Sequence, residues 1–179
     1  MVYIGAQTAL QSKFRPGALL PWVRDFHREA QEWRFNCSMD SAMRVVKEAV
    51  EKIDDFYVYS HKGDVMKVNY LTKAKWLDQV VFKFTSVGPH ETLATAEGVS
   101  TGLLPLAIPL APIANAALCW FPFGDGGKIS ESMRRIRTTI ETIKPNIKVL
   151  PKTTKMSKTN PNAQYQLQKE AEAYQAQQK

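Results

Sequence analysis

Polar and apolar residues follow a helical spacing in two parts of the chain. After Ser38, apolar residues recur at offsets of three, four and seven, which predicts an amphipathic helix to about Ile53 with Ser38 as its N-cap. A second helix is predicted from Ser130, again as N-cap, to about Lys144, because Pro145 cannot continue it. The expected buried stripe of this second helix is Met133, Ile136, Ile140 and Ile143.

Between these helices the spacing changes to the two-residue alternation of strands. We expect strands over 56–60, 65–71, 79–86 and 91–98, the last of them at an edge of the sheet. Gly63 can supply the positive φ of the first turn. Short turns between consecutive strands predict an antiparallel meander. The predicted fold class is therefore α+β, with a three- to four-stranded antiparallel sheet covered by two main helices.

The two ends of the chain lack this clear patterning. Residues 1–21 mix small and polar residues with proline breakers, which predicts an irregular N-terminal arm, and the spacing over 22–33 predicts a short amphipathic helix. From Pro145 onward we expect a linker and then a marginal polar helix over 162–179. The predicted organisation is an arm with its short helix over 1–32, a core domain over 33–144, and a basic linker with a polar tail over 145–179.

The segment 103–123, LLPLAIPLAPIANAALCWFPF, contains no charged residue. It is long enough to cross a bilayer, but its four prolines resist a continuous helix. We expect an apolar insertion that is covered by the protein's own core, by a partner chain or by a lipid interface. The residues predicted to dock on a partner or a membrane are Leu103, Leu104, Leu106, Ile108, Leu110, Trp120, Phe121 and Phe123.

Charge adds a hint about partners. The 179 residues include 24 Lys and Arg against 17 Asp and Glu, a net charge of +7, and the surplus lies toward the two ends. This balance suits an acidic partner surface, although a solubilising surface charge is the simpler alternative. The residues predicted to form a basic surface are Arg134, Arg135, Arg137, Lys152, Lys155 and Lys158.

The sequence carries no recognised catalytic motif. It has no GxSxG, HExxH or GxxxxGK, its three histidines are at unrelated positions, and its two cysteines lack CxxC spacing. We therefore expect no catalytic residue, no metal and no cofactor. The glycine-rich run 124–128 could bind an anion before a helix, but a plain connector is favoured. The cysteine usage and the absence of a secretory signal in 1–11 predict a reducing intracellular compartment, with cytoplasmic or cytoskeletal favoured over organellar.

Two short motifs carry a family resemblance. The strand opening Leu77-Asp78-Gln79-Val80-Val81-Phe82, and the segment Asp125-Gly126-Gly127 followed by Arg134-Arg135-Ile136, are similar to the corresponding segments of the domain of unknown function 1499 family (DUF1499). The resemblance spans about 33–143 and implies the family's fold. The family's Arg-Ser-x-Ser-Arg strand has no clean counterpart in 93–97, and 103–123 is an insertion relative to the family. The family has no established activity, so the resemblance implies none.

These observations predict a non-enzymatic interaction or structural subunit that docks on an acidic partner surface in a larger assembly. Tubulin is one example of such a surface. The alternative is a membrane-surface or lipid-binding module that uses the 103–123 segment on anionic lipid. Nucleic-acid binding ranks third, because the basic residues are scattered and no recognition helix or stacking motif is evident.

Overall fold

The computed structural model describes residues 2–11, 28–118, 127–147 and 149–153. The helices are α1 (Val2–Gln11), α3 (Met39–Lys52), α4 (Ala111–Ala117) and α5 (Lys128–Ile143). The strands are β1 (Arg28–Phe35), β2 (Phe56–Lys62), β3 (Val65–Leu71), β4 (Leu77–Gly88), β5 (Glu91–Ser100) and β6 (Val149–Thr153). The predicted α+β class is confirmed.

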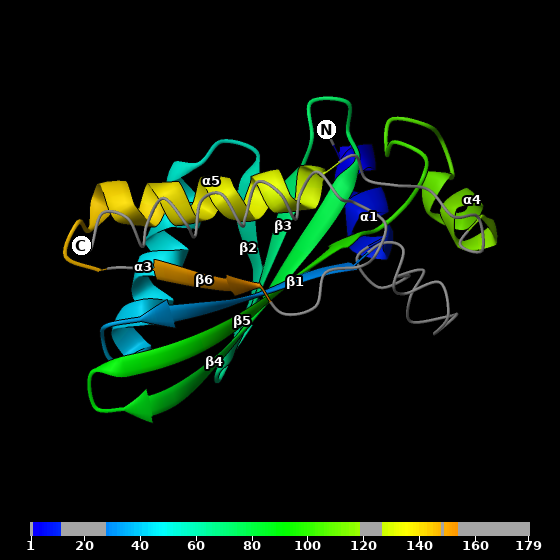
Figure 1. Cartoon of the computed structure of the whole chain (residues 1–179). Coiled ribbons are helices and arrows are strands. Elements are labelled where there is room, and N and C mark those ends of the chain that lie inside the picture. The colour runs from blue at the N-terminus through cyan, green and yellow to red at the C-terminus, as the bar shows by residue number, and fades with distance from the viewer. Residues whose placement is uncertain (1, 12–27, 119–126, 148, 154–179) are drawn as a thin grey trace.

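The strands form one antiparallel sheet in the order β2-β3-β4-β5-β1-β6. Strands β2 to β5 are the expected meander, and the turn between β2 and β3 contains Gly63 at φ 56°, as predicted. Both α3 and α5 pack against one face of this sheet and against each other (Figure 1). The two expected main helices therefore cover the sheet.

The main core lies between this face and the two helices. Alternate residues of the central strands point into it, with Trp33 and Phe35 from β1 beside Phe82 and Phe84 from β4. The rings of Trp33 and Phe82 are 5.2 Å apart between centroids. From α3 the buried side chains are Ala42, Val45, Val46, Ala49 and Val50, and from α5 they include Met133, Ile136 and Ile140. The predicted stripe of α5 is confirmed at Met133, Ile136 and Ile140, whereas Ile143 is only partly buried. The helical spacing also identified the buried face of α3.

The sheet is larger than predicted, because two strands come from segments expected to be something else. The short helix expected over 22–33 is wrong for 28–33, which belongs to β1. The linker expected after Pro145 contains β6, which pairs with β1 in the register Trp33↔Pro151. The strand 91–98 was expected at an edge, but β5 lies inside the sheet between β4 and β1.

Local details of the helices also differ from expectation. The irregular arm expected at the N-terminus is instead helix α1 over the described residues 2–11. Ser38 occupies the N-cap of α3, but its hydroxyl donates to Ser41 Oγ and caps no backbone N–H. The N-cap of α5 is Gly127, at φ 82°, and not Ser130, which lies within the helix.

Candidate docking surface

Helices α1 and α4 lie beside each other, beyond the end of the sheet where α5 begins (Figure 1). We call this region the α1–α4 flank and define it as residues 2–11 together with 103–117. The flank contains no charged residue. It includes most of the segment that the sequence marks as an apolar insertion, joined by a helix from the opposite end of the chain.

The flank is attached to the body of the protein through polar side chains. Over residues 5–11, Gln7, Thr8 and Gln11 form the buried side of α1. The Nε2 atom of Gln7 donates to the carbonyl of Leu106 at 2.8 Å, and Nε2 of Gln11 donates to the carbonyl of Thr101. Because the polar side of α1 faces inward, this helix is oriented in the opposite sense to an ordinary surface helix.

Asn115 plays the same part in α4. Its Oδ1 accepts from the backbone N–H of Leu104 at 2.7 Å, and its Nδ2 donates to the Leu104 carbonyl at 3.1 Å and to Gln11 Oε1 at 3.3 Å. Gly102 makes this close approach possible, since a Cβ at that position would lie 2.3 Å from Asn115 Nδ2. One buried amide thus joins the turn before α4, the helix itself and α1.

A second, small apolar core supports the flank from below. Leu77, Leu106 and Ala111 are buried together, with Leu71 and Leu104 packed against them. This cluster is separate from the main core between the sheet and the helices α3 and α5. Part of the apolar insertion is therefore covered by the protein itself.

Four aliphatic side chains of the flank are exposed to solvent. Leu110 is 67% exposed, Ile113 61%, Ile108 42% and Leu10 39%. Leu110 also has left-handed backbone geometry, with φ 59° and ψ 16°, which is strained for a residue with a side chain. A strained and exposed leucine at the start of α4 is a feature that stability of the fold does not explain.

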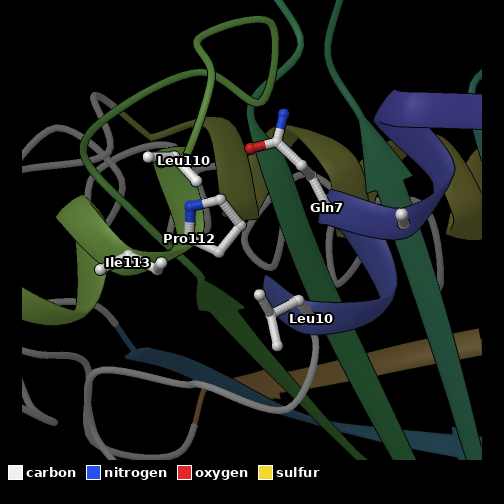
Figure 2. Close-up of a pocket in the computed structure, with 6 residues that line it drawn as sticks. Gln7, Leu10, Leu110, Pro112 and Ile113 are labelled. Carbon is white, nitrogen blue, oxygen red and sulfur yellow. The ribbon is translucent and has the colours of Figure 1, made fainter.

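These side chains surround a pocket of about 160 Å³ between the two helices. Figure 2 shows Gln7 and Leu10 on α1 facing Leu110, Pro112 and Ile113 across it. The sixth lining residue is Ala6. The pocket wall is almost wholly apolar, so it suits an apolar group of a partner better than a polar metabolite.

Lysines lie at the base of the flank. In the turn between β3 and β4, the carbonyl of Lys75 accepts from the N–H of Leu106 at 2.7 Å, and Lys73 is exposed nearby in the same turn. Trp76, which follows Lys75, donates a hydrogen bond from its indole N–H to the Leu103 carbonyl at 2.8 Å. The Nζ atom of Lys128, at the start of α5, lies 4.8 Å from the centroid of the Trp76 ring. An uncharged apolar surface thus has a basic margin.

The structure divides the residues predicted to dock. Leu106 is buried, Leu103 and Leu104 are half-buried, and Ile108 and Leu110 are exposed. Trp120, Phe121 and Phe123 lie outside the described residues. Two further exposed residues of the same surface, Leu10 and Ile113, were not predicted. The sequence gives only a weak signal for them, the absence of charge over 2–11 and over 103–117.

The residues predicted to form a basic surface do not gather on one face in the described structure. Arg134 is exposed and forms an ion pair with Glu131 at 2.8 Å. The guanidinium of Arg135 lies over the rings of Phe56 and Tyr70, and Arg137 is buried. Lys152 lies in β6, whereas Lys155 and Lys158 are outside the described residues.

One group of polar side chains away from the flank has a structural role. The indole of Trp33 donates to Gln31 Oε1 at 3.0 Å, Gln31 donates to Glu29 Oε1 at 3.1 Å, and Ser130 donates to the same oxygen. This chain of hydrogen bonds links β1 to α5. The residues that the structure describes hold no group of three metal-ligating side chains.

The edges of the sheet are poorly suited to pairing with another chain. The register of β2 against β3 shifts between Val58 and Ser60, which bends this edge strand. The other edge, β6, has only five residues, and one of them is Pro151, which cannot donate a backbone hydrogen bond. Edge irregularity of this kind disfavours strand addition. Within the described part of the chain, no helix is both long and apolar enough to cross a bilayer.

Comparison with known proteins adds little to these observations. The sequence matches no protein-family model, and no curated protein matches it significantly. Several solved structures show a distant similarity, CalU16 and TTHA0849 among them. CalU16 from Micromonospora echinospora has a TM-score of 0.34 at 10% identity, covering 64% of this chain and 84% of that one. TTHA0849 from Thermus thermophilus has a TM-score of 0.34 at 9% identity, covering 64% of this chain and 94% of that one. Similarities this weak carry no argument about function.

Proposed function

We propose that the protein is a non-enzymatic interaction subunit that docks on the acidic surface of a partner protein in a larger assembly, and that it docks through the α1–α4 flank. The orientation of α1 and α4 carries this proposal. Polar side chains, Gln7 and Gln11 in α1 and Asn115 in α4, point inward, and α4 also buries Ala111 and Pro112. Leu10, Leu110 and Ile113 are exposed, next to the basic margin at Lys73, Lys75 and Lys128. Exposed apolar patches bordered by polar residues are typical of protein interaction sites.

Leu110 and Ile113 are the residues on which the proposal depends most. They are the most exposed of the aliphatic residues around the pocket, and they lie on neighbouring sides of it. A partner that covers both would remove them from water, and the central apolar residues of an interface carry most of its binding energy. Replacing them with aspartate would also place negative charge against an acidic partner.

The test uses the tagged full-length chain expressed in its own cells. We expect the wild-type protein to elute in a large assembly during gel filtration at low salt. The double variant Leu110→Asp, Ile113→Asp should elute as a smaller species. The amount of this variant that elutes with the assembly should be at least about tenfold lower than for the wild-type chain. Its stability should change by no more than about 0.5 kcal/mol, because both side chains are exposed.

Val87→Asp is the matched control. Val87 is 59% exposed, close to the value for Ile113, and it lies near the end of β4, beside the turn into β5, at the other end of the molecule (Figure 1). This variant should remain in the assembly. The proposal is wrong if the wild-type chain emerges alone and monomeric, or if the double variant stays bound.

A membrane-surface role is the second candidate, and the same geometry supports it. Aliphatic side chains beside lysines also match a surface that enters the interface of an anionic bilayer. Co-sedimentation with phosphatidylserine vesicles at low and high salt tests this candidate. Binding that is sensitive to salt and lost in Leu110→Asp would support it, and no binding at low salt would reject it.

Two further expectations belong to this proposal. We propose a reducing intracellular compartment, cytoplasmic or cytoskeletal, which localisation of a tagged chain can test; tubulin is one acidic partner to try there. The resemblance to DUF1499 is proposed as a relationship of fold. A solved member of that family with the β2-to-β5 meander followed by an arginine-bearing helix would support it, and a different strand order would reject it.

A further inference from the structure

The pocket between α1 and α4 has the size and lining of a receptor for one side chain. Its volume of about 160 Å³ is close to that of an apolar cavity of about 150 Å³ that accepts benzene. Aliphatic groups of Leu10, Leu110 and Ile113 line it from both helices (Figure 2). A single six-membered ring fits this space, and aromatic side chains are the commonest anchors of protein interfaces.

One buried polar atom lies beside this apolar space, on the lining residue Gln7. Gln7 is only 7% exposed, and its Nε2 donates to the Leu106 carbonyl, which fixes the orientation of the amide. The other amide atom, Oε1, is buried and has no hydrogen-bond partner. In Figure 2 this oxygen points toward Leu110. Since a buried acceptor is costly to leave unsatisfied, the occupant of the pocket should carry a donor.

The charges at the base of the flank indicate the surroundings of that side chain. The backbone of Leu106 connects the pocket to the β3–β4 turn, which carries two of the lysines. Its carbonyl accepts from Gln7, and its N–H donates to the backbone carbonyl of Lys75. Lys73, Lys75 and Lys128 lie around the base of the flank, and the flank itself has no acidic residue. A second copy would bring the same three cations against them, so like charges disfavour a symmetric dimer and favour an acidic chain.

We propose that this pocket binds a tyrosine side chain from an acidic segment of the partner protein, with the phenol O–H donating to Gln7 Oε1. This inference rests on the proposed function and names the partner's anchor. The ring fills the apolar pocket, the hydroxyl satisfies the buried acceptor, and Asp or Glu beside the tyrosine meets the lysines. Phenylalanine would fill the same space without satisfying Gln7.

The direct test is a titration of the full-length chain with synthetic acidic peptides, followed by amide chemical shifts. One peptide carries a single central tyrosine, and matched peptides carry phenylalanine or alanine there. We expect shifts in α1, α4 and the β3–β4 turn, with the phenylalanine peptide about two- to tenfold weaker and the alanine peptide silent. High salt and the double variant Lys73→Glu, Lys75→Glu should weaken binding.

Two variants of α1 separate the pocket from the helix that carries it. Ala6→Phe fills the pocket and should abolish binding, whereas Ala9→Phe adds the same ring to an exposed position of α1 that does not line the pocket. Gln7→Met removes the acceptor and should make the tyrosine and phenylalanine peptides bind equally. If Gln7 only stabilised the helix, Gln7→Met would weaken both peptides equally, and the ratio of their affinities would not change.

Four results would overturn the inference. They are no binding of the tyrosine peptide, equal binding of tyrosine and phenylalanine to the wild-type chain, a dimer that Ala6→Phe dissociates, and phosphatidylserine binding that Ala6→Phe blocks. If the double variant Leu110→Asp, Ile113→Asp dissociates from the native assembly but no peptide binds to the wild-type chain, the proposed function stands and the tyrosine anchor is wrong. If the double variant also stays in the assembly, both are wrong.

Discussion

Helices α3 and α1 show two opposite ways of placing an amphipathic helix. In α3 every buried side chain is apolar, and charged pairs such as Lys47–Glu51 and Lys52–Glu48 face water. In α1, over the residues 5–11 whose side chains the structure describes, the buried ones are Gln7, Thr8 and Gln11, and Leu10 faces water. The first arrangement stabilises the domain itself. The second holds a helix in place by hydrogen bonds and leaves its apolar side available to another molecule.

The two regions should also differ in stability. Apolar burial stabilises the sheet and its helices, at about 25 cal/mol per Å². The flank depends more on hydrogen bonds from Gln7, Gln11 and Asn115, each contributing about 0.5 to 1.5 kcal/mol. We therefore expect the flank to open locally more often than the core, as regions with few apolar contacts do. A partner that covers the flank would stabilise it.

The sharpest contrast is expected from one substitution made in both regions. Ile136 is fully buried in α5, and Ile113 is 61% exposed in α4. Ile136→Ala should lower the free energy of unfolding by about 2 to 5 kcal/mol, because it leaves a cavity, whereas Ile113→Ala should change it by less than about 0.5 kcal/mol. Urea unfolding followed by circular dichroism measures both values. Equal losses would show that the flank is part of the core.

Two glycines extend the comparison to backbone packing. A Cβ on Gly98 in β5 would lie 2.1 Å from Ile129 Cγ2 and 2.7 Å from Met133 Cε, so Gly98→Ala should push α5 away and cost about 1 to 3 kcal/mol. In Gly102→Ala the new methyl group displaces the Asn115 amide instead. We expect faster amide hydrogen exchange in α4 with little change in global unfolding. Global destabilisation by Gly102→Ala would contradict a separate flank.

Leu110→Gly tests whether strain in the flank serves docking. Glycine tolerates the left-handed conformation of this residue, so the substitution should slow exchange of the α4 amides by an amount equivalent to about 1 kcal/mol. The same variant should weaken retention in the native assembly, since the exposed side chain is gone. A control, Leu110→Ala, removes the side chain but keeps the strain. Unchanged exchange in Leu110→Gly would show that the conformation is not costly.

A smaller effect is expected where α5 meets the edge of the sheet. The guanidinium carbon of Arg135 lies 5.3 Å from the centroid of Phe56 and 5.7 Å from that of Tyr70, whose rings are stacked. Arg135→Met should cost about 0.5 to 1 kcal/mol through loss of the cation–π contact. Arg134→Met removes a more exposed arginine, paired with Glu131, and should cost less. Urea unfolding compares the two, and the reverse order would contradict this assignment.

The smallest effect concerns the junction of β1 and α3. Burial raises the pKa of the Cys37 thiol. The unfolded chain therefore ionises first, so stability is constant below the ordinary thiol pKa and falls as the pH rises through it toward the folded value. Unfolding at several alkaline pH values, in a Cys119→Ser background, should show this decline, and Cys37→Ser should remove that part of it. A decline of the same size in both variants would exclude the thiol as its source.

The sequence predicted elements whose signal is local. Helices α3 and α5 and the meander β2 to β5 follow from spacing within 15 residues or so and from short turns. Strand β1 was missed because the first residues of its core face are Glu29 and Gln31, whose side chains bond to each other and hide the alternation with Trp33. Only pairing with β5, far along the chain, identifies it as a strand.

Close packing explains why β5 was expected at an edge. Its core-facing residues Ala94, Ala96 and Gly98 are small, which makes the strand weakly apolar. They are small because α5 presses against this strand, with Ile129 in contact with Gly98. Part of the candidate site was predictable too, since 103–123 stands out in the sequence. The contribution of α1 was not, because hydrogen bonds from Gln7 and Gln11 to distant carbonyls leave no periodic signal.

The left-handed conformation of Leu110 has a consequence for how this chain evolves. Substitution by glycine would relieve the backbone strain and remove an exposed aliphatic side chain, so selection for stability alone should replace the leucine quickly. Selection for a partner would keep it. Among relatives that retain Asn115 and the glycine at 102, we therefore expect a large aliphatic residue at position 110 wherever the partner is present, and drift toward glycine or asparagine in lineages that have lost it.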